Sequence, residues 1–376
     1  MDEYGRICAP TLVVDTAKVR ANVGRMAERA RRNGAALRPH LKTHQSATIG
    51  RIFKEAGVSA GTVSSAGMAA YFADSGWDDL TIAFPVNLRE LPDYDALASR
   101  VRLGLLVDHP DAVAALASGL TNPVEVWIKV DVGSRRCGIQ ADRIDAVADL
   151  AAAITRAGGA KARDGRPLLS LAGLLTHDSR SYAAYGAAEV GALYREGTGA
   201  ILKLRDALAA RGFQGLKVSV GDTPSASLLE DWLGADEARP GNFAYYDLQQ
   251  LGTGACSPEE VAVAVACPVV GIYPERGEAV VYGGAVHLSK QAQPPSAGRF
   301  PGASAEASYG GVWRMAAPRW AGLMPGAYLR GLTQEHGIVR LPADGLSTLR
   351  LGELLFVCPV HSCLAAHALR DSTIYL

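Results

Sequence analysis

The chain has 376 residues, of which 48% are hydrophobic and 20% charged, so it can bury a large core and is not expected to be disordered. Its 38 Lys and Arg residues balance 38 Asp and Glu residues, which argues against nucleic acid binding and against a polybasic membrane patch. The sequence contains no run of about 18 apolar residues and no secretory signal, so we expect a cytoplasmic protein that binds neither membrane nor nucleic acid.

The first two thirds of the chain alternate short apolar runs with amphipathic stretches. Residues 16–33 carry apolar side chains at helical spacing, with Asp15 or Thr16 as the N-cap and Gly34 after the last turn. The strands predicted in this part are residues 35–40, 61–64, 80–84, 102–107, 124–130, 168–176, 216–220 and 243–246. Eight strands separated by helices predict an α/β fold of the (β/α)8 TIM barrel type. An open, doubly wound sheet is the alternative, although no GxGxxG motif follows the first strand.

From about residue 252 the pattern changes and predicts a mostly β domain. Residues 291–308 are rich in Pro, Ser, Gly and Ala and predict an irregular loop within it. The strands predicted on either side of that loop are residues 261–272, 279–282, 337–341 and 354–358. We therefore predict a barrel domain over residues 1–251 and a β domain over residues 252–376.

The segment RPHLKTH at residues 38–44 is the first that indicates chemistry. On a strand, Arg38, His40 and Lys42 would share one face. In a barrel, Lys42 would lie at the carboxyl end of its strand, where barrel active sites lie. Neighbouring positive charge and partial burial would lower the pKa of its amine and make it a nucleophile. A basic stripe on an exposed strand is the alternative.

Five segments together resemble the fold-type III pyridoxal phosphate enzymes, in particular the D-serine dehydratase and D-threonine aldolase family. The resemblance runs through nearly the whole chain in order and is carried by TLVVD at 11–15, RPHLKTH at 38–44, DVG and RCG within 131–138, GDTPS at 221–225 and RPGNF at 239–243. It implies an alanine racemase-like barrel that holds pyridoxal 5'-phosphate, a C-terminal β domain and a homodimer.

The resemblance assigns roles to barrel residues. Lys42 matches the lysine that binds the cofactor covalently, and Arg136 matches an arginine near the cofactor ring. His177 and Tyr182 match groups that pack against the ring or bond to it. Lys42, Arg136 and His177 are thus the predicted catalytic residues, and a salt bridge for Arg136 or a surface role for His177 and Tyr182 is the alternative. Glycine-containing turns after the last strands of a barrel commonly hold phosphate, which implicates Gly221, Asp222, Thr223, Gly241 and Asn242.

A second group, His361 and Cys363, predicts a metal site within the same resemblance. Imidazole and thiolate favour Zn2+ over Mg2+ or Ca2+, although an isolated His-x-Cys is more often accidental. In the family this position holds the metal pair, and His-x-Cys resembles the zinc-dependent dehydratases whereas His-x-Asp resembles the manganese-using aldolases. Zn2+ is therefore the predicted ion, with Mn2+ or another divalent cation as the alternative. The other cysteines form no CxxC pair and are expected to be reduced structural thiols.

The predicted function is a pyridoxal phosphate- and zinc-dependent lyase that acts on a small D-amino acid. D-serine or 3-hydroxy-D-aspartate would give a 2-oxo acid and ammonia, with Lys42 removing the α-proton and zinc stabilising the departing hydroxide. A metal-dependent D-threonine aldolase, which gives glycine and an aldehyde, is the first alternative. An amino-acid racemase, a non-catalytic pyridoxal phosphate-binding protein and a barrel without cofactor are the others.

Overall fold

The computed structural model describes residues 4–316 and 318–376, which form two compact units. Unit 1 contains the described residues up to Val23, then Thr43–Ile49 and Asn242–Leu376. Unit 2 contains Gly24–Lys42 and Gly50–Gly241. Among the described residues, no helix is both long enough and apolar enough to span a membrane.

Unit 2 is built on a ring of parallel strands, which confirms the predicted barrel. The strand order is β2-β10-β9-β8-β6-β5-β4-β3, and an isolated parallel bridge between His40 and Thr62 joins the two ends of the series. The strands are β2 (Ala36–Leu37), β3 (Gly61–Val63), β4 (Asp79–Pro85), β5 (Arg102–Val107), β6 (Val124–Asp131), β8 (Leu169–Leu175), β9 (Lys217–Val220) and β10 (Glu237–Ala238), and β7 (Ile139–Gln140) pairs with β6 off this path.

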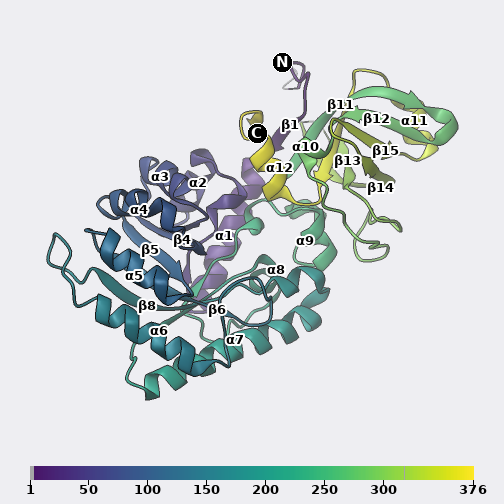
Figure 1. Ribbon diagram of the computed structural model, residues 1–376. Helices are drawn as coiled ribbons and strands as arrows, with labels where there is room; N and C mark the ends of the chain where they lie inside the picture. Colours follow the sequence, from purple (N-terminus) through teal and green to yellow (C-terminus); the bar gives the residue numbers. More distant parts are fainter. Residues whose placement is uncertain (1–3, 317) are drawn as a thin grey trace. The chain divides into compact units, whose positions relative to one another are not determined.

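Helices connect the strands and lie outside the ring (Figure 1). The first helix begins at Asp15, whose Oδ1 accepts hydrogen bonds from the N–H groups of Ala17 and Lys18 at 3.0 and 3.2 Å, so Asp15 is its N-cap. It ends before Gly34, which has a φ of 64°. The helices up to the end of the barrel are α1 (Thr16–Arg32), α2 (Ala47–Glu55), α3 (Ala66–Asp74), α4 (Leu91–Ala98), α5 (Pro110–Gly119), α6 (Ile144–Ala157), α7 (Gly186–Ala210) and α8 (Thr223–Leu228).

Two predictions about the barrel strands are wrong in detail. The eighth strand is β10, not residues 243–246, which instead overlap a short 3-10 helix over Asn242–Ala244. All four of residues 243–246 are buried, and a continuously buried apolar run resembles a strand in sequence. The first strand is shorter than predicted because a 3-10 helix over Leu41–Thr43 follows it, so Lys42 lies in a helical turn.

The expectation that Arg38 shares one face of a strand with Lys42 is also wrong. The Nε of Arg38 donates to Glu237 Oε2 at 2.5 Å, and its Nη1 donates to Asp79 Oδ1 at 2.5 Å. Asp79 and Glu237 are the first residues of β4 and β10. The Arg38 side chain therefore points toward the amino-terminal end of the strands, away from the end at which barrel active sites lie.

Unit 1 contains a closed antiparallel barrel, which confirms the predicted β-rich C-terminal region. The series β12-β15-β14-β13-β16-β11 closes because β12 also pairs with β11, and β1 (Thr11–Val14) joins β11 from the beginning of the chain. Residues 291–308 contain no strand, only an isolated bridge between Gln293 and Ser308, as the predicted loop requires. The remaining elements are β11 (Val263–Tyr273), β12 (Glu278–Tyr282), β13 (Gly310–Ala316), β14 (Arg319–Leu332), β15 (His336–Arg340), β16 (Leu354–Pro359), β17 (Thr373–Tyr375), α9 (Leu248–Thr253), α10 (Ala285–Leu288), α11 (Ala343–Thr348) and α12 (Ser362–Ala368).

The buried ion pair of Arg38 gives a first prediction. Arg38→Met should lower the thermal midpoint of unfolding because Glu237 would lose its ion-pair partner while its side chain is only 7% exposed. Breaking such a pair costs about 3–5 kcal/mol. Arg102→Gln is the matched control, since Arg102 pairs with Glu125 at 52% side-chain exposure and exposed pairs contribute at most about 1 kcal/mol. Circular dichroism melts of both variants decide, and equal midpoints would contradict this prediction.

Candidate active site

Basic side chains gather at the carboxyl ends of the barrel strands. Burial, and then the charges of Arg136 and Lys42, lower the pKa of His177 to about 3. Burial, and then the charges of Lys42, Arg239 and His177, lower the pKa of His40 well below its ordinary value. Both imidazoles are therefore neutral at pH 7, and the cations around them favour an anion at this end of the barrel.

Arg136 lies in the turn after β6, and its side chain is exposed. In the part of the chain that the structure describes, no carboxylate forms an ion pair with its guanidinium, so the structure provides no partner for the alternative salt bridge. A guanidinium in this position can bind an anionic group of a ligand.

Arg239 is a further candidate. It lies in the RPGNF segment, but the sequence pattern assigned no role to it. It follows β10 directly, is 6% exposed, and donates from Nη1 to Ser219 Oγ and from Nη2 to the carbonyl oxygen of Thr176. Burial lowers the pKa of Arg239 to about 10, against the opposing effect of Glu237. The sequence did not place Arg239 at the carboxyl end of a strand, because it predicted the eighth strand after Arg239 rather than before it.

The turn after β9 has the features of a phosphate site. Gly221 has no room for a side chain, since a Cβ there would lie 2.8 Å from the backbone nitrogen of Arg239. The Oγ1 of Thr223 is buried and has no hydrogen-bond partner among the described residues. The N–H of Thr223 donates to Tyr182 Oη at 3.3 Å. An anion that displaced the Tyr182 hydroxyl or bound beside it could accept hydrogen bonds from both the N–H and the Oγ1 of Thr223.

Asp222 lies in the middle of this turn, but its side chain has another partner. Its Oδ1 accepts from the N–H of Ser225 at 2.7 Å and caps α8. Burial raises the pKa of the Asp222 carboxyl to about 6. If Asp222 contacts the cofactor as predicted, it would therefore do so through its backbone and not through its side chain.

His177 and Tyr182 lie beside each other after β8, with ring centroids 6.0 Å apart and planes tilted by 42°. His177 Nδ1 donates to the carbonyl oxygen of Gly221. Because the neutral imidazole has one N–H, its Nε2 is the acceptor nitrogen and can take a hydrogen bond or a proton from a ligand.

The second candidate group is in unit 1, at the start of α12. His361 Nδ1 donates to Gln291 Oε1 at 2.8 Å, so Nε2 carries the lone pair of the ring, which is the electron pair that a metal ligand donates. Cys363 Sγ lies 3.3 Å from Thr43 Oγ1 and 3.6 Å from Asn242 Nδ2. Burial raises the pKa of the Cys363 thiol, but hydrogen bonds with His361 and Thr43 and the charge of His361 lower it more, so the net shift is downward. Thiolate and imidazole form a donor set that fits zinc.

Asp247 fixes the residue between these two donors. It is fully buried, and its Oδ2 accepts from the N–H of Ser362 at 2.8 Å and from Asn242 Nδ2 at 2.6 Å. Nothing in the spacing of the sequence indicated this carboxylate. The side chain of Asn242 thus belongs to the group around Cys363, and its predicted contact with a phosphate would come from its backbone, as for Gly241.

Another buried amine in unit 2 was also missed. Lys129 on β6 is 4% exposed, and burial lowers its pKa to about 8. Its Nζ donates to the carbonyl oxygen of Val130 at 2.8 Å. Lys42, in contrast, is exposed and therefore accessible to a ligand.

Comparisons with known proteins match the whole described fold. The family model "Alanine racemase, N-terminal domain" matches residues 14–249, and "Putative serine dehydratase domain" matches residues 262–375. A D-threo-3-hydroxyaspartate dehydratase from Delftia sp. (strain HT23) is 31% identical over 94% of this chain and 90% of its own length. A D-serine dehydratase from Dictyostelium discoideum is 26% identical over 98% of this chain and 94% of its own length.

Solved structures agree with these matches. That of D-threo-3-hydroxyaspartate dehydratase from Delftia sp. HT23 has a TM-score of 0.86 and 29% identity and covers 98% of this chain and 94% of its own. Two further structures are D-threo-3-hydroxyaspartate dehydratases with one histidine or one cysteine replaced by alanine, at positions two residues apart, and the cysteine variant is in the metal-free form.

The lowered pKa of Cys363 gives a second prediction. In chelator-treated protein, the rate of alkylation of Cys363 should reach half its maximum at a pH below that of an ordinary cysteine, because the thiolate is the reacting form. Cys267, whose pKa burial raises to about 12, should react slowly over the same range. Peptide mapping by mass spectrometry resolves the two sites. His361→Ala should move the Cys363 midpoint upward, and an unchanged midpoint would contradict the assigned cause.

Proposed function

We propose that this chain, which belongs to the fold-type III pyridoxal phosphate family with an alanine racemase N-terminal domain and a serine dehydratase domain, is a zinc-dependent D-amino acid dehydratase. The proposed substrate is a D-β-hydroxy amino acid, D-serine or 3-hydroxy-D-aspartate, and the products are a 2-oxo acid and ammonia. The names of the Delftia and Dictyostelium relatives support this substrate class. The observation that carries the proposal is that one chain combines a cationic barrel mouth around Lys42 with an imidazole–thiolate pair.

The barrel residues fit a cofactor with a phosphate group. The unpartnered Thr223 Oγ1 and the backbone of the Gly221 turn would hold the phosphate, and Lys42 would bind the cofactor covalently. When bound, pyridoxal phosphate supplies a ring that delocalises the negative charge left at the α-carbon. The positive charges of Lys42, Arg136 and Arg239 would be compensated by these anionic groups.

The chain's own side chains then divide the work of binding and proton transfer. The amine of Lys42 would take the α-proton of the substrate. The guanidinium of Arg136 would bind an anionic group at the edge of the ring. His177, held by the hydrogen bond from its Nδ1 to Gly221, would present Nε2 as an acceptor, and Tyr182 would pack beside it.

The unit 1 pair fits a zinc ion, which His361 Nε2 and Cys363 Sγ would hold. An ion there would supply positive charge to a departing hydroxide, which is otherwise a poor leaving group. Thr43, whose Oγ1 contacts Cys363, directly follows Lys42 in the sequence. Mn2+ or another divalent ion remains the alternative occupant.

The alternative activity is a metal-dependent D-threonine aldolase, since a D-threonine aldolase from Arthrobacter sp. is 28% identical over 38% of this chain and 39% of its own length. It would use the same residues and break the Cα–Cβ bond. A racemase or a non-catalytic pyridoxal phosphate-binding protein would leave the pair of His361 and Cys363 without a role. A homodimer and a cytoplasmic location are part of the proposal and rest on the family resemblance and on composition.

Product analysis tests the proposed activity. Protein supplied with pyridoxal phosphate and zinc should convert D-serine or 3-hydroxy-D-aspartate to a 2-oxo acid and ammonia and leave the L-isomers unchanged. A lactate dehydrogenase-coupled assay detects pyruvate, and chromatography detects other 2-oxo acids and glycine. Glycine with an aldehyde as the products of D-threonine would instead establish the aldolase.

Metal removal tests the zinc assignment separately. Complete chelation should abolish elimination while the visible absorption of the bound cofactor persists, and readdition of zinc should restore turnover. Gln291→Ala should weaken zinc binding about 10- to 100-fold because Gln291 orients His361. Gln214→Ala, at an exposed site in unit 2, is the matched control and should leave zinc binding unchanged. Undiminished turnover without zinc would refute the assignment.

A further inference from the structure

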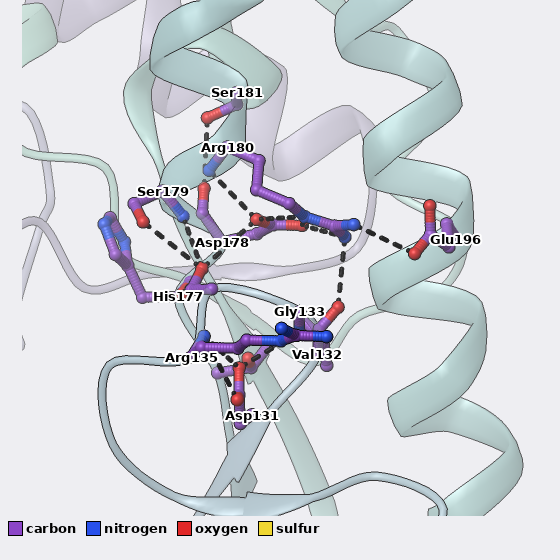
Figure 2. Close-up of polar contacts among 12 residues, drawn as sticks. Asp131, Val132, Gly133, Arg135, His177, Asp178, Ser179, Arg180, Ser181 and Glu196 are labelled. Carbon is purple, nitrogen blue, oxygen red and sulfur yellow. Dashed lines mark hydrogen bonds and ion pairs between the residues drawn. The ribbon is translucent and has the colours of Figure 1, made fainter.

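A single guanidinium connects three segments of the barrel, one that follows β6 and two that follow β8. Figure 2 shows the side chain of Arg180 between the turn after β6, the segment after β8 and helix α7. Its Nη2 donates to Asp178 Oδ2 at 2.7 Å and to the carbonyl oxygen of Val132 at 3.0 Å. Its Nη1 donates to Glu196 Oε1 on α7 at 2.9 Å. Val132, Asp178 and Glu196 are thus the three partners of the Arg180 guanidinium.

Two glycines lie close to this arrangement. Gly133 has a φ of 130°, and a Cβ there would lie 2.8 Å from Cζ of Arg180. A Cβ at Gly197 on α7 would lie 3.2 Å from Asp178 Oδ2. At Gly133 the turn after β6 thus approaches the Arg180 side chain more closely than a residue with a Cβ would permit, and at Gly197 helix α7 packs tightly against Asp178.

The turn after β6 also adopts a conformation that needs support from its surroundings. Arg135 has a φ of 51°, which is uncommon for a residue other than glycine, and its N–H donates to both carboxylate oxygens of Asp131 at 3.1 Å. Such strained positions persist where neighbouring contacts hold them, and they concentrate at functional sites.

A second connection between the turn after β6 and the segment after β8 comes from the side chain of Ser134. The Oγ of Ser134 accepts from the N–H of Ser179 at 2.9 Å and donates to the carbonyl oxygen of His177 at 3.3 Å. The turn after β6 and the segment after β8 are therefore joined both through the guanidinium of Arg180 and through the hydroxyl of Ser134.

The two joined segments carry two of the proposed catalytic residues. Arg136 follows the strained turn directly, and His177 begins the segment after β8. The charge of Arg136 lowers the pKa of His177, so the two side chains lie within electrostatic reach of each other. A shift of either segment would therefore change how both side chains meet a ligand.

We propose that Arg180 is a positioning residue, which holds the Arg136 turn and the His177 segment in the one relative arrangement that the reaction requires. The proposal rests on the proposed function. Arg180 acts through geometry, because Asp178 and Glu196 neutralise its charge, and not by touching substrate or cofactor. The planar guanidinium donates to Asp178, Val132 and Glu196 at once. An ammonium group cannot reproduce this arrangement of N–H donors.

Kinetics of the holoenzyme provide the first test. Arg180→Gln should lower kcat on the order of 100-fold with KM changed less than about threefold, the effect of a misplacement of about 1 Å. Arg180→Lys should recover only part of that loss. Glu196→Gln removes only the negative charge of a side chain that is 64% exposed and should keep kcat within about twofold.

Hydrogen exchange of the cofactor-free protein provides a readout that does not depend on activity. Arg180→Gln should speed exchange in peptides covering 132–138 and 177–182 and leave those of β3 to β5 unchanged. Ser134→Ala should act in the same direction, and the double variant should show a kcat loss smaller than the product of the single losses, because both side chains maintain one arrangement.

The outcomes separate this proposal from the proposed function. Wild-type kcat or unchanged exchange in Arg180→Gln would overturn the positioning role while leaving the dehydratase intact. A fall in kcat that only parallels a loss of bound cofactor or of folded protein would overturn it as well. Wild-type protein without dehydratase activity would refute the proposed function, and the exchange measurement would then still decide whether Arg180 holds the two segments together.

Discussion

The positive charge at the carboxyl end of the barrel strands is the constraint on which the candidate site depends. Burial, and then the charges of Lys42, Arg136 and Arg239, hold two imidazoles in the neutral form. Like charges that lie close together repel one another, which raises the free energy of the site unless a counterion is present. An anionic cofactor with a phosphate and an amino acid substrate with a carboxylate would both relieve this repulsion.

The two ends of the barrel use arginine in opposite ways. Arg38 is satisfied by Asp79 and Glu237 and contributes to stability, whereas Arg136 has no ion pair among residues 4–316 and 318–376 and remains available to a ligand. Arg180 stands between these cases, since its charge is neutralised while its contacts connect two loops. The role of each arginine is therefore decided by the position of the nearest carboxylates and not by the residue type.

The sequence predicted the barrel because its strands are bounded by helices and glycines, and it placed seven of the eight strands. The eighth was missed since β10 has only two residues, too few for a periodic pattern, while the buried run at 243–246 resembles a strand. The sequence also did not predict the residues whose roles depend on partners far along the chain. Asp247, Gln291 and Arg180 gain their positions from contacts with residues far along the chain, which no local spacing encodes.

The central claim is that Lys42 is the lysine that binds the cofactor in the cationic barrel mouth. Lys129 is the competing amine, because its pKa of about 8 favours the nucleophilic form although it is buried. Borohydride reduction of the protein with bound pyridoxal phosphate, followed by peptide mapping, tests the claim most directly. We expect one modified lysine per chain, at Lys42, and loss of the modification in Lys42→Ala. Modification at Lys129, or none at all, would contradict it.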